Sequence, residues 1–113
     1  MQLEVKKYLF DIKRSAKYLV QFTDGKTQQD YLNDPLLRSA VERQFEIIGE
    51  AVNKLAKIEP SVVSRISEHR KLVNFRNILI HGYTEIDDYL VWDLLQSKLS
   101  ILIKEIDTLY NEE

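Results

Sequence analysis

Apolar residues recur at steps of three and four along most of the chain, which is the spacing of one face of an α-helix. Residues 2–23 show it first, at Val5, Leu9, Ile12, Ala16 and Leu19. Residues 35–58 repeat it at Leu37, Val41, Phe45, Ile48, Val52 and Leu55. The stretch after Asp87 repeats it at Val91, Leu95, Leu99, Leu102, Ile106 and Leu109. No segment reads as a strand, so the pattern predicts an all-α fold.

Residues that start and stop helices divide this pattern. Gly25 ends the first helix, and Asp34 with Pro35 starts the second as N-cap and first helical residue. Residues 27–33 fit either a helical turn or a loop. A break at Glu59-Pro60 precedes a short helix or turn over 61–68, with Ser61 as its candidate N-cap, and Asp87 or Asp88 caps the final helix.

A further helix is expected from about His69 to Gly82. The resulting four long helices with short connections predict an antiparallel four-helix bundle with one or two additional short helices. The whole chain, residues 1–113, forms one domain in this prediction. Gly49 interrupts the second long helix, and a close approach of another helix explains it best. Trp92 lies off the final apolar stripe, so it either packs beneath the residue 83–86 loop or joins Tyr89 in a partner surface.

Composition restricts the class of protein and its expected location, but it does not indicate a function. The chain is 44% hydrophobic and 30% charged, contains no cysteine and has a net charge of −2. These values fit a globular domain and exclude disulfides and thiolate metal sites. No apolar run is long enough to span a membrane, and the N-terminus lacks the core of a signal peptide. We therefore expect a cytoplasmic protein with no membrane association.

Polar chemistry is concentrated in residues 72–83, where Arg76, Asn77, His81 and Tyr83 interrupt a strongly apolar stretch. On a helix, Asn77 and His81 share a face, and Tyr83 lies two turns beyond Arg76. Arg76 and His81 lie about 140° apart on a regular helix. They converge only if the helix loosens near Gly82, a candidate left-handed C-cap, or if two copies of the segment meet.

Charged residues near this segment leave alternatives open. Arg70 and Lys71 are candidate RNA contacts, but they also fit a solvated face paired with the acidic C-terminal helix. The lysines of residues 2–23 are solvated or, as a minor alternative, contact phosphate. Glu42 or Glu46 is expected to pair with Arg76 and orient it. No ligand set for a metal is complete, so no metal or cofactor is expected.

These residue types suit RNA cleavage without a metal, in which the 2′-hydroxyl attacks the neighbouring phosphorus. Histidine titrates near neutral pH, so His81 suits the proton transfers. The planar fork of Arg76 suits the charge that develops on phosphorus. Asn77 suits holding the imidazole or a phosphate oxygen. One histidine is few for two proton transfers, and a homodimer would supply a second.

The spacing Arg76-x4-His81-x-Tyr83 resembles the signature of the HEPN superfamily in its HepT-like branch. Two further stretches resemble the same branch, namely Ala40–Ala51 (AVERQFEIIGEA) and Ile86–Asp93 (IDDYLVWD). The resemblance implies a helical, homodimeric endoribonuclease toxin with Arg76 and His81 in its active site. It also implies a cognate nucleotidyltransferase antitoxin that adenylylates Tyr83.

Two other classes of function remain open. A non-catalytic subunit that binds a nucleotide or a partner such as a nucleotidyltransferase would use the same residues to hold phosphate alone. A structural subunit explains the helices but not the polar motif. The Tyr83 hydroxyl, in the same way, fits either modification or the capping of a backbone group.

Overall fold

A computed structural model gives the structure of the chain and describes residues 2–82 and 86–112. Every regular element in these ranges is a helix, so the all-α prediction is confirmed. In chain order the helices are α1 (Leu3–Thr23), α2 (Gln28–Asn33), α3 (Pro35–Ile58), α4 (Pro60–Val63), α5 (His69–His81), α6 (Asp88–Ser97) and α7 (Leu99–Asn111).

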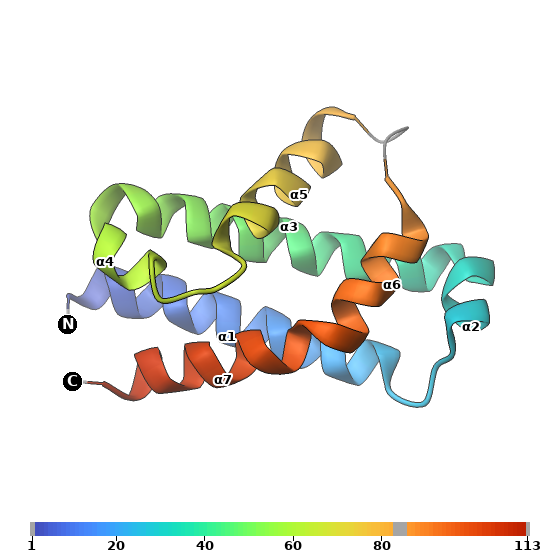
Figure 1. Ribbon diagram of the computed structural model, residues 1–113, viewed down its shortest axis with the longest axis horizontal. Coiled ribbons are helices and arrows are strands. Elements are labelled where there is room, and N and C mark those ends of the chain that lie inside the picture. The colour runs from blue at the N-terminus through green and yellow to red at the C-terminus, as the bar shows by residue number, and fades with distance from the viewer. Residues whose placement is uncertain (1, 83–85, 113) are drawn as a thin grey trace.

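The long helices pack as a bundle in which α3 occupies a central place (Figure 1). One side of α3 packs on α1 and another side on α5, while α7 packs on the far side of α1. Helices α3 and α7 both run opposite to α1, and α5 crosses α3 at an angle (Figure 1). The predicted antiparallel bundle is therefore confirmed.

The apolar stripes seen in the sequence form the core. All five stripe positions of α1, all six of α3 and all six of α6 and α7 are buried. They merge into one cluster, to which Leu72 and Leu79 of α5 also belong. Burial of these side chains from water is the main force that holds the helices together. No helix within the described residues is both long enough and apolar enough to cross a membrane.

Caps predicted from the sequence hold several helix ends. Oδ1 of Asp34 accepts hydrogen bonds from the backbone N–H groups of Leu36 and Leu37, both at 3.1 Å. Asp87 caps α6 in the same way. Gly25 has φ of +71°, which is the left-handed conformation that favours glycine at the end of α1. Residues 27–33, left open by the sequence, form helix α2, because Thr27 and Asp30 complete a capping box.

Two local predictions are wrong, and a third is right only in part. The final helix is divided at Lys98 into α6 and α7. Ser61 is not an N-cap, because Pro60 is already the first residue of α4. Gly82 is the C-cap of α5, as predicted, but its φ of −153° lies outside the left-handed region. Its N–H donates to the carbonyl of Ile78 at 2.7 Å, so the end of α5 has a backbone partner without a left-handed residue.

Trp92 is buried, as the packing alternative predicted, but the partner that the structure identifies is Tyr31 of α2. The two ring centroids lie 5.5 Å apart. Whether Trp92 also contacts the predicted residue 83–86 loop lies largely outside the described residues. Tyr89, the other half of the pair noted in the sequence, is 62% exposed. The aromatic pair is therefore split between the core and the surface.

The turn between α4 and α5 is fastened to α7. Nη1 and Nη2 of Arg65 donate to the carboxylate of Glu112, at 2.7 and 2.5 Å. The backbone N–H and hydroxyl of Ser67 donate to Glu105. Glu105 of α7 and Glu112, the residue directly after α7, thus fix the segment that leads into α5.

Candidate active site on helix α5

Gly49 determines where α5 lies on α3. A Cβ atom at this position would collide with Cβ of Arg76 and would lie 2.6 Å from the carbonyl oxygen of Leu72. The absence of a side chain lets the two backbones approach at this crossing. The close approach predicted from Gly49 is confirmed, and the helix that approaches is the one that carries the motif.

Arg76 lies at this crossing and is held from two sides. Its Nη2 forms an ion pair with Glu50 of α3, the residue next to Gly49. Its Nη1 donates to Oδ1 of Asn77 at 3.0 Å. Its Nε is buried and has no hydrogen-bond partner among the described residues. The expected orienting carboxylate therefore comes from α3, but it is Glu50 rather than Glu42 or Glu46.

Arg76 faces a groove of about 340 Å³ between α1, α3 and α5. Charged side chains dominate its wall, with Asp11, Glu46 and Glu50 as carboxylates and Lys7, Arg43, Lys54 and Arg76 as cations. Lys7 pairs with Asp11 at 3.8 Å, Arg43 with Glu46 at 3.0 Å and Lys54 with Glu50 at 3.9 Å. Cations outnumber carboxylates by one, so the groove suits an anionic group such as a phosphate.

His81 is the last residue of α5 and is exposed. Its side chain forms no hydrogen bond or ion pair with any residue that the structure describes. Helix α5 is continuous from His69 to His81, so the direction of His81 differs from that of Arg76 by about 140°. Asn77 is exposed one turn before His81, and its amide oxygen already faces Arg76. A single chain therefore brings Glu50, Arg76 and Asn77 together but leaves His81 apart from them.

Glu42 and Glu46 are both half-buried on α3. They line a neighbouring groove of about 230 Å³ with Ser39, Arg43 and Leu79. Burial raises the pKa of Glu42, the negative charge of Asp88 raises it further, and Arg38 opposes both effects. Arg43 and Glu46 belong to both grooves, so the two form one path across α3.

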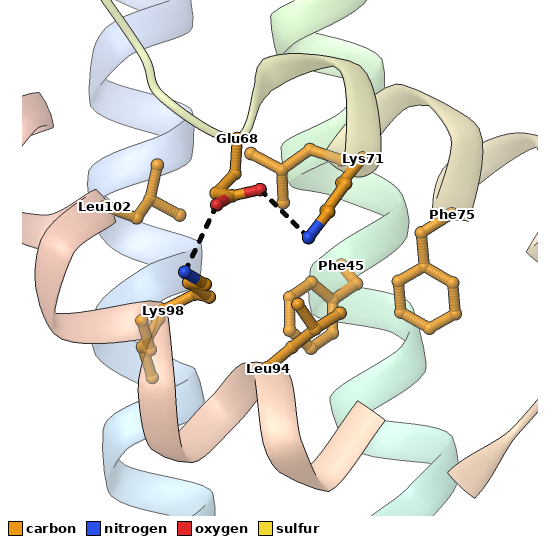
Figure 2. Close-up of a pocket in the computed structure, with 9 residues that line it drawn as sticks. Phe45, Glu68, Lys71, Phe75, Leu94, Lys98 and Leu102 are labelled. Carbon is orange, nitrogen blue, oxygen red and sulfur yellow. Dashed lines mark ion pairs between the residues drawn. The ribbon is translucent and has the colours of Figure 1, made fainter. Parts of the chain in front are cut away.

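Lys71 and Arg70, the candidate RNA contacts, lie elsewhere on α5. Lys71 pairs with Glu68 at 3.6 Å, and Glu68 also pairs with Lys98 at 3.6 Å, beside a small apolar pocket (Figure 2). Arg70 is exposed, with no ion pair among the described residues. Neither residue lines the groove that contains Arg76.

Several groove residues escaped the sequence reasoning. Tyr8, Arg43 and Lys54 were not among the predicted site residues, whereas Lys7 is one of the lysines for which phosphate contact was a minor alternative. The one available signal was Gly49, because a helix that crosses there must face the α3 residues one turn to either side. Tyr83 lies outside the described residues. Within those residues, no three His, Asp or Glu side chains gather as a metal site would require.

Comparisons with known proteins identify the family of the chain. The family model described as Ribonuclease HepT-like matches residues 12–109. "Putative RNase MJ1380" of Methanocaldococcus jannaschii is 34% identical over 108 residues, which cover 92% of this chain and 94% of that protein. "Probable ribonuclease HepT" of Thermococcus cleftensis is 29% identical over 106 residues, with 90% and 92% covered. No solved structure is significantly similar to the chain. The chain therefore belongs to the HepT-like ribonuclease family.

Proposed function

We propose that the protein is a metal-independent endoribonuclease toxin that cleaves RNA by attack of a 2′-hydroxyl on the adjacent phosphorus. The observation that carries this proposal is the arrangement of Arg76. Its guanidinium is held by Glu50 and Asn77 at the wall of a groove with an excess of cations. A guanidinium has five N–H donors, so donors beyond those two contacts remain for phosphate oxygens.

His81 performs the proton transfers in this reaction, and Arg76 stabilises the charge that develops on phosphorus. One histidine accepts the proton of the 2′-hydroxyl, and a second donates a proton to the departing 5′-oxygen. The bond from phosphorus to the 5′-oxygen breaks as the bond to the 2′-oxygen forms. The products are a 2′,3′-cyclic phosphate and a free 5′-hydroxyl.

A homodimer supplies the second histidine in this proposal. Because α5 is a regular helix to its last residue, loosening of the helix within the described residues does not turn His81 toward Arg76. The remaining route is a two-fold axis beside the C-terminal end of α5, where His81 of each copy approaches Arg76 of the other. Each active site would then be composite, with Arg76 from one copy and His81 from the other.

The decisive experiment compares the two histidines of α5. His81→Ala should lower RNA cleavage by roughly 100-fold or more, because general acid–base catalysis commonly contributes that much. His69→Ala, at the first residue of the same helix, should leave cleavage close to the parent rate. Both reactions are run in excess chelator, and the product ends are analysed for 2′,3′-cyclic phosphate.

Equal cleavage by folded His81→Ala and by the parent would refute the catalytic assignment. The competing proposal is a subunit that binds a nucleotide or a nucleotidyltransferase partner without catalysis. It draws support from the separation of His81 and Arg76 within one chain. It predicts RNA or nucleotide binding that Arg76→Ala weakens, together with no cleavage by any variant.

We further propose that a cognate nucleotidyltransferase antitoxin inactivates the protein by adenylylating Tyr83. The tyrosine hydroxyl attacks the α-phosphorus of ATP, its proton passes to a base, and pyrophosphate departs. Tyr83 follows His81 by two residues in the chain, so the phosphate of an AMP group there would compete with RNA for the cations of the motif.

The test combines the protein with its nucleotidyltransferase and ATP and then maps modified peptides by mass spectrometry. The parent should gain AMP at Tyr83 and lose ribonuclease activity. Tyr83→Phe should gain none, while Tyr89→Phe, at a tyrosine that is 62% exposed, should be modified like the parent. Full labelling of Tyr83→Phe would place the switch at another residue.

A further inference from the structure

The face of α1 that points away from the bundle carries an exposed stripe, which we name the outer stripe. Its members are spaced alternately by four and three residues and are Leu3, Lys7, Phe10, Arg14, Lys17 and Gln21. All six are exposed. Only Leu3 and Phe10 are apolar, whereas a seam for another helix needs apolar residues at nearly every such position. The outer stripe is therefore a poor helix-docking face.

Positive charge concentrates on α1. The helix has five cationic side chains and two carboxylates, a net charge of +3 in a chain whose net charge is −2. Asp11 pairs with Lys7 at 3.8 Å and with Arg14 at 3.6 Å, yet these two side chains remain 66% and 50% exposed. Lys17 forms no ion pair with any described residue. The outer stripe thus presents three accessible cations in a row.

One flat surface lies between these cations, and another lies just beside them. The Arg14 guanidinium sits over the Phe10 ring, 5.5 Å from its centroid. Tyr18, beside Lys17, is 40% exposed and stacks on Phe22 with ring centroids 5.7 Å apart. Unpaired nucleic-acid bases stack on aromatic rings and on guanidinium planes, while cations between them hold the backbone. The outer stripe combines both features.

The outer stripe is continuous with the Arg76 groove. Lys7 belongs to both, and the groove wall on this side is completed by Tyr8 and Asp11 of the same helix. From Lys7 to Lys17 the stripe runs for roughly 15 Å along the helix axis. A strand that leaves the groove beside Lys7 therefore meets Phe10, Arg14 and Lys17 in turn.

We propose that the outer stripe of α1 binds single-stranded RNA on one side of the Arg76 groove. The inference rests on the proposed ribonuclease function and adds the class of its substrate. Bases in a duplex are already stacked on one another, so their faces are not accessible to Phe10 or Tyr18. The outer stripe therefore selects unpaired RNA.

The test measures binding of fluorescent single-stranded RNA to the full chain with His81→Ala, so that the probe is not cleaved. Phe10→Ala should weaken binding about tenfold and leave its salt dependence unchanged, because a stacking platform carries no charge. Arg14→Ala with Lys17→Ala should lower the slope of log affinity against log salt concentration by about 1.4. The matched control removes two exposed lysines elsewhere, Lys57→Ala with Lys104→Ala, and should leave the slope close to the parent value.

The possible outcomes distinguish the inference about the outer stripe from the proposed catalysis. Parent-like RNA binding by Phe10→Ala and by the double variant would overturn the inference and leave the outer stripe as a face for an acidic protein. Equal affinity of the parent for duplex RNA would also overturn it. RNA binding that depends on the stripe, without cleavage by the unmutated chain, would support the inference and refute the proposed catalysis. If the stripe variants cleave RNA with the KM of the parent, the result would support the proposed catalysis and refute the inference about the outer stripe.

Discussion

Arg76 is oriented before any ligand arrives. Glu50 holds it from the neighbouring helix, and Asn77 holds it from its own. A guanidinium fixed in this way loses less freedom when it binds phosphate, and catalysis depends on such fixed geometry. In the proposed reaction, Glu50 is therefore a positioning residue, which acts through Arg76.

Glu50→Gln should lower kcat by roughly tenfold or more, because a small displacement of a positioned group has a large effect on rate. The free energy of unfolding should fall by about 1 kcal/mol or less, since both side chains are partly exposed to solvent. Steady-state cleavage assays and urea unfolding check the two values.

The matched control is Glu46→Gln, four residues earlier on the same helix and the same groove wall. Its carboxylate pairs with Arg43 and not with Arg76. A loss of kcat in Glu46→Gln as large as in Glu50→Gln would indicate a general effect of groove charge, and the positioning role would be rejected.

The sequence could identify the motif residues but not the partner of Arg76. Glu42, Glu46 and Glu50 follow one another by four residues, so all three share a face of α3 and periodicity cannot separate them. The choice depends on where α5 crosses α3. That crossing lies at Gly49, and the adjacent carboxylate is Glu50.

At the scale of elements, α3 and α5 pack so closely that residue 49 has no room for a side chain. Gly49→Ala must push α5 away, because the new methyl group would meet Arg76 and the Leu72 carbonyl. We expect a loss of about 1–3 kcal/mol in the free energy of unfolding, as overpacking typically causes. Cleavage should fall as well, because Arg76 moves with the helix.

Gly25→Ala is the matched control for this change. Its φ of +71° makes an alanine cost about 1–2 kcal/mol, but a Cβ there would have no neighbour within 4 Å. Both variants should therefore lose similar stability, measured by urea unfolding, while only Gly49→Ala loses activity per folded molecule. Equal activity per folded molecule in the two variants would show that cleavage does not depend on the α3–α5 crossing.

The electrostatic interaction between Glu42 of α3 and Asp88, the first residue of α6, can be tested by the pH dependence of stability. Burial and the charge of Asp88 raise the pKa of Glu42 in the folded state above its ordinary value of 4.5. The charged form of Glu42 therefore opposes folding as pH rises through the folded pKa. Glu42→Gln should be more stable than the parent near neutral pH, and the two should converge below about pH 4.5. The measurement is urea unfolding across this pH range. A stability difference between Glu42→Gln and the parent that grew toward acid pH would contradict the expectation.

Periodicity was sufficient for the helices and their buried faces but not for the break at Lys98. The apolar stripe runs through that point without a change of spacing, and Leu95 and Leu99 on either side are both buried. No glycine or proline marks the position. The break is therefore a product of packing between helices, which a single stripe does not encode.

For the molecule as a whole, the proposed dimer follows from the directions of two side chains on one regular helix. A single chain contains one His81 and one Arg76 about 140° apart, and a two-fold axis is the simplest way to join them. The chain has no cysteine, so His81→Cys introduces a unique thiol.

We expect a dimer at micromolar concentration in sedimentation experiments, and a short bis-maleimide should link His81→Cys into covalent dimers. Lys26→Cys, in the exposed turn after α1, should remain unlinked under the same conditions. A chain that stays monomeric at high concentration would exclude the composite site. A dimer that links through Lys26→Cys alone would place the axis on another face.

The turn before α5 is tied to α7, and this has a consequence for how the protein is made. Ser67 and Arg65 find their carboxylate partners 38 and 47 positions later in the chain. Translation proceeds from the N-terminus, so the motif helix emerges from the ribosome well before the residues that fasten its entrance. The approach to the motif is therefore completed only after α7 and Glu112 have been synthesised, so under the proposed function the nascent chain would acquire its activity late in its own synthesis.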